Sequence, residues 1–504
     1  MKYLQGQHIL ILGLGSSGLA MTRWCAQMGA DITVADTRES PANLQVLKSE
    51  LPEVQFKSGP FATNLIEGTS VRAVFASPGL APIETLPVIA AAQAMGLWVG
   101  GELSLFVQAL ENLKATRDYA PQVLAITGTN GKTTVTALTG QLIERAGKTV
   151  KVAGNIGPTL LDTLRLSMAT ELPEVWVLEL SSFQLDNAGP FEPSAATVLN
   201  ITQDHLDWHG NMAAYAAAKE KIFGASSLMV LNRDDARVMA MLPEPVRAKL
   251  QKPVVRAHVT YGAEMPQRPG DFGLETVNGM TWLVRALEAD ETRRLRKGEV
   301  EEIHIQRLMP ADALRIRGRH NAVNALAALA LATSTGASLA SMLFGLREYK
   351  GEPHRVEPVA IVNEVEYFDD SKGTNVGATV AALLGLGAER RVVVILGGDG
   401  KGQDFSPLAE PVARYARAVV LIGRDAPLIR EEIKASGVPL IDASTLPEAV
   451  NAAKNMAQAG DAVLLSPACA SFDMFRDYPH RAQVFCQAVA EIAEAAGQVM
   501  EASL

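Results

Sequence analysis

Short apolar runs alternate with longer amphipathic stretches along the first hundred residues. The runs are HILILG (8–13), DITVAD (31–36), VRAVFASPG (71–79) and LWVGG (97–101). Each run has the length of a buried strand, and the stretches between them have room for helices. Such alternation is typical of parallel strands joined by crossover helices, so it predicts an α/β fold.

The same pattern begins again near residue 122 and a third time beyond residue 350. KGEPHR at 350–355 combines Gly and Pro after a helical pattern, which indicates a boundary. At about 100–200 residues per domain, we predict three α/β domains over 1–101, 102–350 and 351–504. NALAALALATS (324–334) is a predicted helix. The six further predicted strands are VLAIT (123–127), VWVLEL (175–180), AATVLN (195–200), RVVVILGG (391–398), ARAVVLIG (416–423) and AVLLSP (462–467).

Residues 262–312 interrupt this pattern because they are polar and strongly charged, as in ADETRRLRKGEVEE at 289–302. We predict short antiparallel strands here, or an excursion from the central domain. This stretch is also the main part of the chain that matches none of the motifs described below.

Composition and charge narrow the class of protein. The 504 residues are 48% hydrophobic and 20% charged, with a formal net charge of −9, which is ordinary for a soluble folded chain and argues against general binding to nucleic acid or membrane surfaces. No window approaches about 20 apolar residues, and the N-terminal MKYLQGQHIL lacks signal-peptide architecture. The three cysteines are far apart and show no C-x-x-C pairing. They are typical of reduced thiols, so we expect a cytoplasmic protein.

The first strand runs into a glycine-rich turn. Gly13, Gly15 and Gly18 have the G-x-G-x-x-G spacing, and Asp36 follows 18 residues after Gly18. This pattern is the fingerprint of a dinucleotide-binding turn, with the acid placed for a ribose hydroxyl. The glycines cradle a pyrophosphate and do not read nicotinamide. NAD and other diphosphate ligands therefore both remain open.

A second glycine loop, AITGTNGKTT, joins a predicted strand to a helix that begins at Lys132. Backbone N–H groups in such a loop bind phosphate oxygens, Lys132 can reach the β- and γ-phosphates, and Thr133 can offer a hydroxyl to Mg²⁺. Gly128 stands three residues before Gly131, whereas the standard Walker A motif needs five. We interpret the loop as a nucleoside triphosphate site, which an NAD dehydrogenase would not need.

Polar side chains also follow later strands. Glu179 ends a buried run and could hold Mg²⁺ or cap the Ser181/Ser182 turn. Asp204, His205, Asp207 and His209 cluster after another run, and Lys219 lies in an Ala-rich helical stretch, where a solvated charge is the ordinary interpretation. Further polar candidates at strand ends or helix starts are His320, Asn321, Asn324, His354, Arg355, Asp370, Lys372, Thr374, Asn375, Lys401, Ser471 and Phe472, each of which could be turn chemistry.

Taken in order, these motifs resemble the Mur ligases, and among them the branch that adds D-glutamate. The motifs are GTNGKTT, GNIG (154–157), ELSSFQ, DHLD, HN-x-x-NALAA, HR, DDSKGTN, GGDGK and SPACASFD-x-F, and they cover nearly the whole chain. The resemblance implies an N-terminal Rossmann-like domain, a central P-loop-type ATPase domain and a C-terminal Rossmann-like domain.

For the N-terminal domain, the resemblance implies that Gly13–Gly18 cradles the diphosphate of a UDP-linked substrate and not NAD. Asp36 would then belong to a uracil-binding segment. The implied UDP-substrate contacts are Gly15, Ser16, Ser17, Asp36, Thr37, Arg38, Ser77, Gly79, Asn155, Gly157, Ser181 and Gln184.

For the central domain, the resemblance implies ATP, two Mg²⁺ sites and a carbamylated Lys219. A carbamate turns the lysine into an oxygen ligand that Mg²⁺ prefers. Implied metal ligands are Thr133, Glu179, His205 and Lys219, and implied catalytic residues are Lys132, His205 and Lys219. Implied ATP contacts are Gly128, Thr129, Asn130, Gly131, Lys132, Thr133, Thr134, Asn321, Arg355 and Asp370, while His354 would be an interdomain contact.

For the C-terminal domain, the resemblance implies a site for the incoming amino acid. Two lysines and hydroxyl donors suit an acceptor with two carboxylates. Tyr478 stands where relatives carry Phe, and the Asp-Asn-Pro motif of the branch that adds a diamino acid is absent. The implied D-glutamate contacts are His205, Lys372, Thr374, Lys401, Ser471, Phe472 and Tyr478.

The implied activity is two-step amide ligation through an acyl phosphate, in peptidoglycan precursor synthesis. The expected partners are the small molecules UDP-N-acetylmuramoyl-L-alanine, D-glutamate and ATP, with no nucleic acid, no membrane insertion and a monomeric chain. Three alternatives remain: a Mur-family ligase with another acceptor, an NAD-binding Rossmann oxidoreductase, and a catalytically idle nucleotide-binding module.

Overall fold

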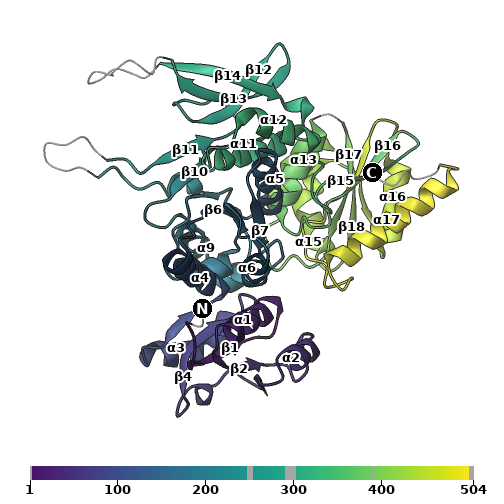
Figure 1. Ribbon diagram of the computed structural model, residues 1–504. Helices are drawn as coiled ribbons and strands as arrows, with labels where there is room; N and C mark the ends of the chain where they lie inside the picture. Colours follow the sequence, from purple (N-terminus) through teal and green to yellow (C-terminus); the bar gives the residue numbers. More distant parts are fainter. Residues whose placement is uncertain (1–2, 247–253, 290–301, 389, 499–504) are drawn as a thin grey trace. The chain divides into compact units, whose positions relative to one another are not determined.

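The computed structural model describes residues 3–246, 254–289, 302–388 and 390–498, without the side chain of Asp207 (Figure 1). The chain divides into two compact units. The first comprises residues 1–201, 208–261 and 327–345, and the second comprises 202–207, 262–326 and 346–504. Within the described residues, no helix has the length and apolar character needed to cross a bilayer.

The first unit begins with a parallel five-stranded sheet in the order β3-β2-β1-β4-β5. The strand order reverses beside β1 (His8–Leu12), so the loops after β1 and β4 are neighbours at the carboxyl edge, where open α/β sheets bind ligands. The other elements are β2 (Asp31–Asp36), β3 (Gln55–Ser58), β4 (Val71–Ala76), β5 (Trp98–Gly100), α1 (Ser16–Gln27), α2 (Leu44–Glu50), α3 (Pro82–Ala94) and α4 (Glu102–Arg117).

The first unit contains a second parallel sheet, of six strands in the order β11-β10-β9-β6-β8-β7. The central strand β6 (Gln122–Thr127) lies between β8 and β9, so the loops after all three strands meet at one edge. The other elements are β7 (Val150–Gly154), β8 (Val175–Glu179), β9 (Ala195–Val198), β10 (Leu228–Asn232), β11 (His258–Tyr261), α5 (Lys132–Arg145), α6 (Leu160–Ala169), α7 (Ser182–Asp186), α8 (Leu206–His209), α9 (Met212–Glu220) and α10 (Ala236–Met239).

Helices α1, α4 and α6 pack on one another between these two sheets, and one continuous apolar core includes residues from both (Figure 1). Arg23 of α1 adds a polar link, because its guanidinium pairs with Asp162 of α6 at 3.0 Å and with Glu50 at 2.7 Å. The N-terminal and central sheets are therefore fastened together within this unit.

The second unit contains a small antiparallel sheet of β12 (Phe272–Val277), β13 (Met280–Glu288) and β14 (Ile303–Pro310). The prediction of antiparallel strands over 262–312 is thus confirmed for the described part of that stretch, while residues 290–301 lie outside it. Two helices follow along the chain, α11 (Arg319–Thr333), which confirms the predicted apolar helix, and α12 (Leu339–Glu348), and each of them has residues in both units.

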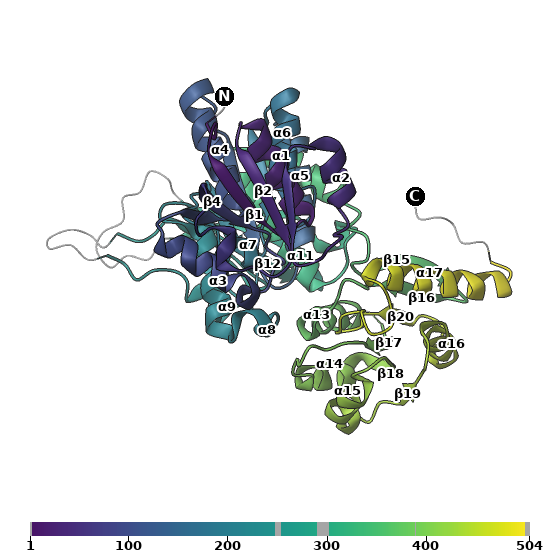
Figure 2. The same ribbon diagram turned by 90° about the horizontal axis from the view of Figure 1, so that it is seen from below.

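The last sheet has the order β15-β16-β20-β17-β18-β19. β20 (Ala462–Leu465), the last strand along the chain, pairs in parallel with both β16 (Val365–Asp369) and β17 (Val392–Gly397). Helices α13–α15 cover one face, and α16 and α17 the other (Figure 2). The remaining elements are β15 (Glu357–Val362), β18 (Ala416–Ile422), β19 (Leu440–Asp442), α13 (Val376–Gly387), α14 (Ala409–Tyr415), α15 (Ala426–Ile433), α16 (Leu446–Met456) and α17 (Tyr478–Ala495).

The edge strand β15 was not predicted from the sequence. It forms an antiparallel hairpin with β16 through Asn363 and Glu364, whose φ angles are +52° and +63°. Positive φ at both central residues is the type I′ geometry that suits a hairpin, but Asn-Glu is a much weaker signal for it than Asn-Gly. The predicted parallel strands of all three sheets are otherwise confirmed.

Candidate active site

The N-terminal glycine turn is held tightly from two sides. A Cβ on Gly18 would lie 1.9 Å from the carbonyl oxygen of Gly13, so only glycine fits there. The Ser77 hydroxyl, at the end of β4, donates to the same carbonyl at 3.0 Å, and the Leu14 N–H donates to Asp36 Oδ2 at 2.7 Å. The turn that the sequence predicted as a diphosphate cradle is therefore held by the protein's own hydrogen bonds, with Ser16 exposed and Ser17 half-buried at the start of α1.

The carboxylate of Asp36 is occupied by hydrogen bonds from within the protein. Its carboxylate accepts from the N–H of Leu14 and, within 3.0 Å, from the N–H, Nε and Nη2 of Arg38. The hydrogen bond from Arg38, opposed by burial, lowers the pKa of Asp36 to about 2. A carboxylate offers about four acceptor positions, so those of Asp36 are filled. This arrangement does not favour an NAD ribose contact, whereas Thr37 and Arg38 stay exposed.

The loop from Gly128 to Gly131 lies at the end of β6 and leads into α5. Gly128 and Gly131 have φ of +153° and +83°, values that favour glycine. Asn200, which follows β9, clamps Asn130: its Oδ1 accepts from the Asn130 N–H at 2.8 Å, and its Nδ2 donates to the Asn130 carbonyl at 3.0 Å. The loop is therefore fixed by the neighbouring strand.

Lys132 and Lys219 converge on this loop. The Lys132 Nζ donates to the carbonyls of Gly128 at 2.9 Å and Thr129 at 2.8 Å. The Lys219 Nζ, on α9, donates to the Gly128 carbonyl at 2.9 Å and to the Thr127 hydroxyl at 3.2 Å. Lys219 is buried and lies over the Tyr215 ring, so the alternative of a solvated helix charge is wrong.

Glu179 ends β8 beside this loop and is 1% exposed. Its Oε1 accepts from the Asn155 amide at 2.7 Å, whereas Oε2 is buried with no hydrogen-bond partner among the described residues. The helix cap is made by Ser181 and Gln184, whose side chains bond each other's backbone N–H at 3.2 and 2.9 Å. Capping therefore does not account for Glu179. A buried carboxylate oxygen without a donor fits a cation, and Mg²⁺ favours such oxygens.

His205 and His209 have different surroundings. His205 belongs to the short segment of the second unit and has φ of +52°, with its N–H on Asp204 Oδ1 at 2.9 Å. Asp204 also accepts from the Asn375 amide at 3.3 Å. His209 belongs to the first unit, where it bonds the Ser182 hydroxyl at 3.0 Å and stacks on Phe183. Packing thus accounts for His209, while His205 sits in a strained loop.

In the second unit, the predicted amino-acid contacts follow three adjacent strands. Lys372 and Thr374 follow β16, Ser471 and Phe472 follow β20, and Lys401 follows β17. The Lys372 Nζ lies 5.7 Å from the ring centroid of Tyr478, the first residue of α17. Phe472 and Lys401 are exposed, and Ser471 is buried. The structure thus brings Lys372 and Tyr478 together at this edge.

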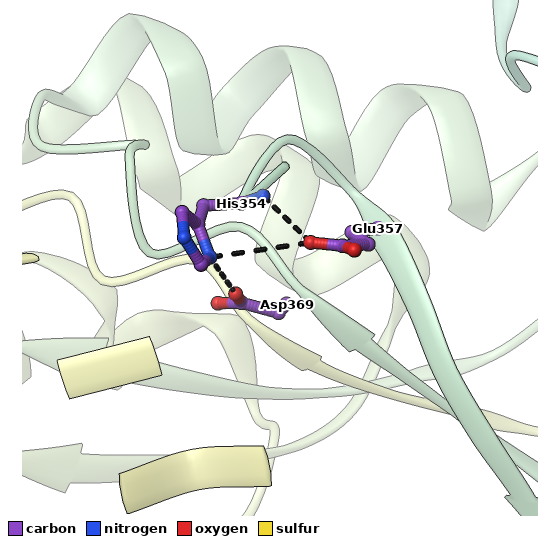
Figure 3. Close-up of side chains that lie close together, drawn as sticks. All are labelled: His354, Glu357 and Asp369. Atoms are coloured by element: carbon purple, nitrogen blue, oxygen red, sulfur yellow. Dashed lines mark hydrogen bonds and ion pairs between the residues drawn. The ribbon is translucent and has the colours of Figure 1, made fainter. Parts of the chain in front are cut away.

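His354 lies next to this group, between two carboxylates (Figure 3). Its Nδ1 is 2.7 Å from Asp369 Oδ2 and 4.0 Å from Glu357 Oε2, and its ring meets that of Tyr478 edge-on. The hydrogen bond with Asp369 raises the pKa of His354. The three side chains are close enough to surround a cation, but the short Nδ1–Oδ2 contact fits an ion pair with a protonated ring.

Asn321 and Arg355, two predicted ATP contacts, line one cavity of about 650 Å³ together with Arg315, Lys350 and Phe368. This volume is in the range of small-molecule sites. Asp370, the third predicted contact in this unit, is only 6% exposed. Its carboxylate accepts from the Ser466 hydroxyl at 2.6 Å, and burial raises its pKa to about 7.

Three residues that support these loops were not predicted from the sequence. They are Asn200, Arg481 of α17 and Glu102, the first residue of α4. Glu102 is buried and accepts from the N–H of Leu161, at the start of α6, at 3.0 Å; Ser17 is a further hydrogen-bonding neighbour. Asn200 had a usable signal, because it is a polar residue directly after an apolar strand, like Glu179. Glu102 and Arg481 had none.

Three family models match successive parts of the chain. They are the MurD-like N-terminal domain of Mur ligases over residues 7–101, the Mur ligase middle domain over 126–332, and the Mur ligase glutamate ligase domain over 354–469. Together they cover the glycine turn, the Gly128–Gly131 loop and the loops of the last sheet that carry Lys372 and Lys401, whereas Ser471, Phe472 and Tyr478 follow the last matched residue.

Curated relatives match over almost the whole length. A UDP-N-acetylmuramoylalanine–D-glutamate ligase of Albidiferax ferrireducens is 69% identical, with 99% of each chain covered. The protein of the same name from Cupriavidus pinatubonensis is 57% identical, covering 98% of this chain and 99% of that one.

Solved structures share the fold at low sequence identity. A UDP-N-acetylmuramate–alanine ligase, MurC of Thermotoga maritima, is 20% identical with a TM-score of 0.55, covering 96% of this chain and 99% of that one. A MurF ligase from the same organism, in complex with ADP, is 15% identical with a TM-score of 0.56, covering 98% and 96%. From its sequence relatives and from the three domain models, this chain belongs to the Mur ligase family.

Proposed function

We propose that this chain joins D-glutamate to UDP-N-acetylmuramoyl-L-alanine with hydrolysis of ATP to ADP and phosphate, a step of peptidoglycan precursor synthesis. Relatives up to 69% identical over 99% of the chain carry the name of this ligase. The structural observation that carries the ATP-dependent part is the Gly128–Gly131 loop with Lys132 on it and the unpartnered buried oxygen of Glu179 beside it. A phosphate loop next to a vacant carboxylate oxygen suits a magnesium nucleotide.

Each of the three domains would bind one substrate. Residues 1–101 would bind the UDP-linked substrate, 102–350 ATP and 351–504 the amino acid. For the UDP part, the formed turn and the exposed Thr37 and Arg38 support the proposal, with Asp36 acting through Arg38. The remaining proposed contacts are Gly15, Ser16, Ser17, Ser77, Gly79, Asn155, Gly157, Ser181 and Gln184.

Polar side chains at the ends of strands and the starts of helices would supply the ATP and metal contacts. Glu179, Thr133, His205 and Lys219 (the last as a carbamate) would hold Mg²⁺ at two sites, and the metal, when bound, would neutralise phosphate charge. Unmodified Lys219 is a cation and cannot be a ligand. The proposed ATP contacts are Gly128, Thr129, Asn130, Gly131, Lys132, Thr133, Thr134, Asn321, Arg355 and Asp370.

The reaction would proceed in two steps. An oxygen of the alanyl carboxylate attacks the γ-phosphorus of ATP; the bond from this phosphorus to the bridging oxygen breaks, and ADP leaves. The D-glutamate amine then attacks the acyl carbon, the carbon–oxygen bond to phosphate breaks, and the amide forms. Lys132 stabilises the charge that develops on the phosphoryl oxygens. For His205 we favour the metal-ligand role over the alternative role of accepting the proton that the amine loses.

The acceptor site would consist of Lys372, Thr374, Lys401, Ser471, Phe472 and Tyr478, with His205. Two ammonium groups at this sheet edge suit a dicarboxylate. All substrates are small and water-soluble, which supports a cytoplasmic enzyme, and we propose that it acts as a monomer.

The test is phosphate release from ATP in the presence of UDP-N-acetylmuramoyl-L-alanine, with D-glutamate, L-glutamate and diamino acids supplied one at a time. Release that depends strictly on D-glutamate is the expected result. Release with another amino acid would reassign the acceptor within the family. Failure of every amino acid to support release would contradict the ligase proposal.

A further inference from the structure

The guanidinium of Arg481 is buried beneath the loops of the last sheet. The residue is 1% exposed and lies one turn after Tyr478 on α17. Its Nη1 donates to the Cys469 carbonyl at 3.1 Å, and its Nη2 donates to the Ser371 carbonyl at 2.7 Å. One side chain therefore holds the backbone of two loops that are far apart in sequence.

These two loops carry proposed contacts to the amino acid. Ser371 directly precedes Lys372, and Cys469 lies two residues before Ser471. The loops also bond each other, because the Ala468 N–H donates to the Gly373 carbonyl at 3.1 Å. The planar fork of the Arg481 guanidinium thus fixes the spacing between the loops, which a flexible ammonium could not do as well.

In the part of the chain that the structure describes, no carboxylate forms a direct ion pair with Arg481. Its described hydrogen bonds go to neutral carbonyls, and Nε is buried with no hydrogen-bond partner among the described residues. Asp369, Asp370 and Asp473 act on it only through space, and burial lowers its pKa to about 10, so it stays cationic at neutral pH. A buried cation without a contacting carboxylate is unfavourable by itself, so the two hydrogen bonds to backbone carbonyls and the more distant carboxylates are what stabilise it.

We propose that Arg481 is a positioning residue for the amino-acid acceptor: its buried guanidinium sets the spacing of the Ser371–Thr374 and Cys469–Ser471 loops, which carry the proposed acceptor contacts. The inference rests on the proposed function and adds a residue to that site. Arg481 acts through the residues that it holds, because its guanidinium is shielded from solvent.

Arg481→Met and Arg481→Lys test this role by separating the hydrogen-bonding fork from the charge. Met keeps the length of the side chain without charge or donors, and Lys keeps the charge without the fork. Since hydrogen bonds from charged groups contribute enough to change binding about tenfold, we expect Arg481→Met to raise the KM for D-glutamate by about tenfold or more. The KM values for ATP and the UDP-linked substrate should stay within about twofold, and Arg481→Lys should recover part of the loss.

Arg417→Met is the matched control. Arg417 is on β18 of the same sheet and pairs with Asp461, just before the start of β20, at the edge opposite the loops. Its loss should lower the melting temperature without changing the KM for D-glutamate. Equal KM changes for all substrates in Arg481→Met, or an unchanged KM for D-glutamate, would overturn the proposal. If Arg481→Met fails to fold, Arg481→Lys decides, since a wild-type KM for D-glutamate in that variant would show that the fork does not position the loops.

The proposed function and this inference fail in different ways. If the wild-type enzyme shows no release with D-glutamate, the proposed function fails before any variant is made. If the wild type uses D-glutamate and Arg481→Met uses it equally well, only the role of Arg481 fails.

Discussion

Lys132 and Lys219 donate to the same atom, the carbonyl oxygen of Gly128. Two ammonium groups on one oxygen repel each other, and the repulsion is strong for buried charges. Converting Lys219 to a carbamate would replace this repulsion with attraction to Lys132. The geometry therefore gives a local physical reason for the modification that the family resemblance implies.

Carbamylation of Lys219 has a direct spectroscopic test. With ¹³C-labelled bicarbonate, the wild-type protein should show a carbamate carbon signal that Lys219→Ala lacks. We expect the same variant to lose ligase activity by about 100-fold or more, as for other preorganised charge-stabilising groups. Activity of Lys219→Ala near the wild-type level would contradict the role.

Glu179→Gln should remove the response to Mg²⁺. The amide oxygen can still accept from Asn155, but the charge that holds the cation is lost. We expect Mg²⁺ to raise the melting temperature of the wild type and not of the variant, and the Mg²⁺ concentration for half-maximal activity to rise about tenfold or more. Equal stabilisation of both proteins by Mg²⁺ would place the metal elsewhere.

Glu102 should make stability fall as the pH rises. Burial raises its pKa from 4.5 to about 7. Between these values the folded protein keeps a proton that the unfolded chain has released, so stability decreases up to about pH 7 and then levels off. A shift of this size corresponds to about 3 kcal/mol.

Melting temperatures of the wild type and Glu102→Gln from pH 5 to pH 8 measure this effect. The variant should lose the Glu102 share of the decrease, whereas Glu111→Gln, which removes an exposed acid from the same helix α4, should keep it. Identical pH profiles for Glu102→Gln and the wild type would show that Glu102 is already ionised.

Asp369→Asn should lower the pKa of His354. The Asp369 carboxylate raises this pKa in the wild type, so the stabilisation from the pair is fully present below pH 6.5 and is lost as the pH rises through the higher folded pKa. NMR titration of the His354 ring resonance should show a midpoint above 6.5 in the wild type and a lower one in the variant. An unchanged midpoint would mean that the ion pair is absent in solution.

The residues that the sequence could predict are those directly after strands. Lys132, Glu179 and Lys401 each end or follow a clear apolar run, so the pattern of strand and loop was enough to locate them near ligand-binding edges. Strand neighbours were not predictable, because the pattern does not say that β8 lies between β6 and β7.

The residues that hold the backbone near the site could not be predicted either, and the reason is different. Glu102 and Arg481 look like ordinary helix residues, and only the fold brings them to Leu161 and to Ser371. The burial of Lys219 could not be predicted either, since its Ala-rich helix predicts solvent exposure, whereas tertiary packing buries the side chain. Long-range burial and charge depend on contacts that a local pattern does not contain.

The position of β20 between β16 and β17 has a consequence for the order in which the loops form during translation. During synthesis, the Gly128–Gly131 loop and Lys132 leave the ribosome hundreds of residues before Cys469, Ser471 and Arg481. A nascent chain can therefore form its glycine loop early, but it cannot fix the Ser371–Thr374 loop against the Cys469–Ser471 loop until Arg481 has been added. The two loops of the last sheet are thus the later of these sites to form during translation.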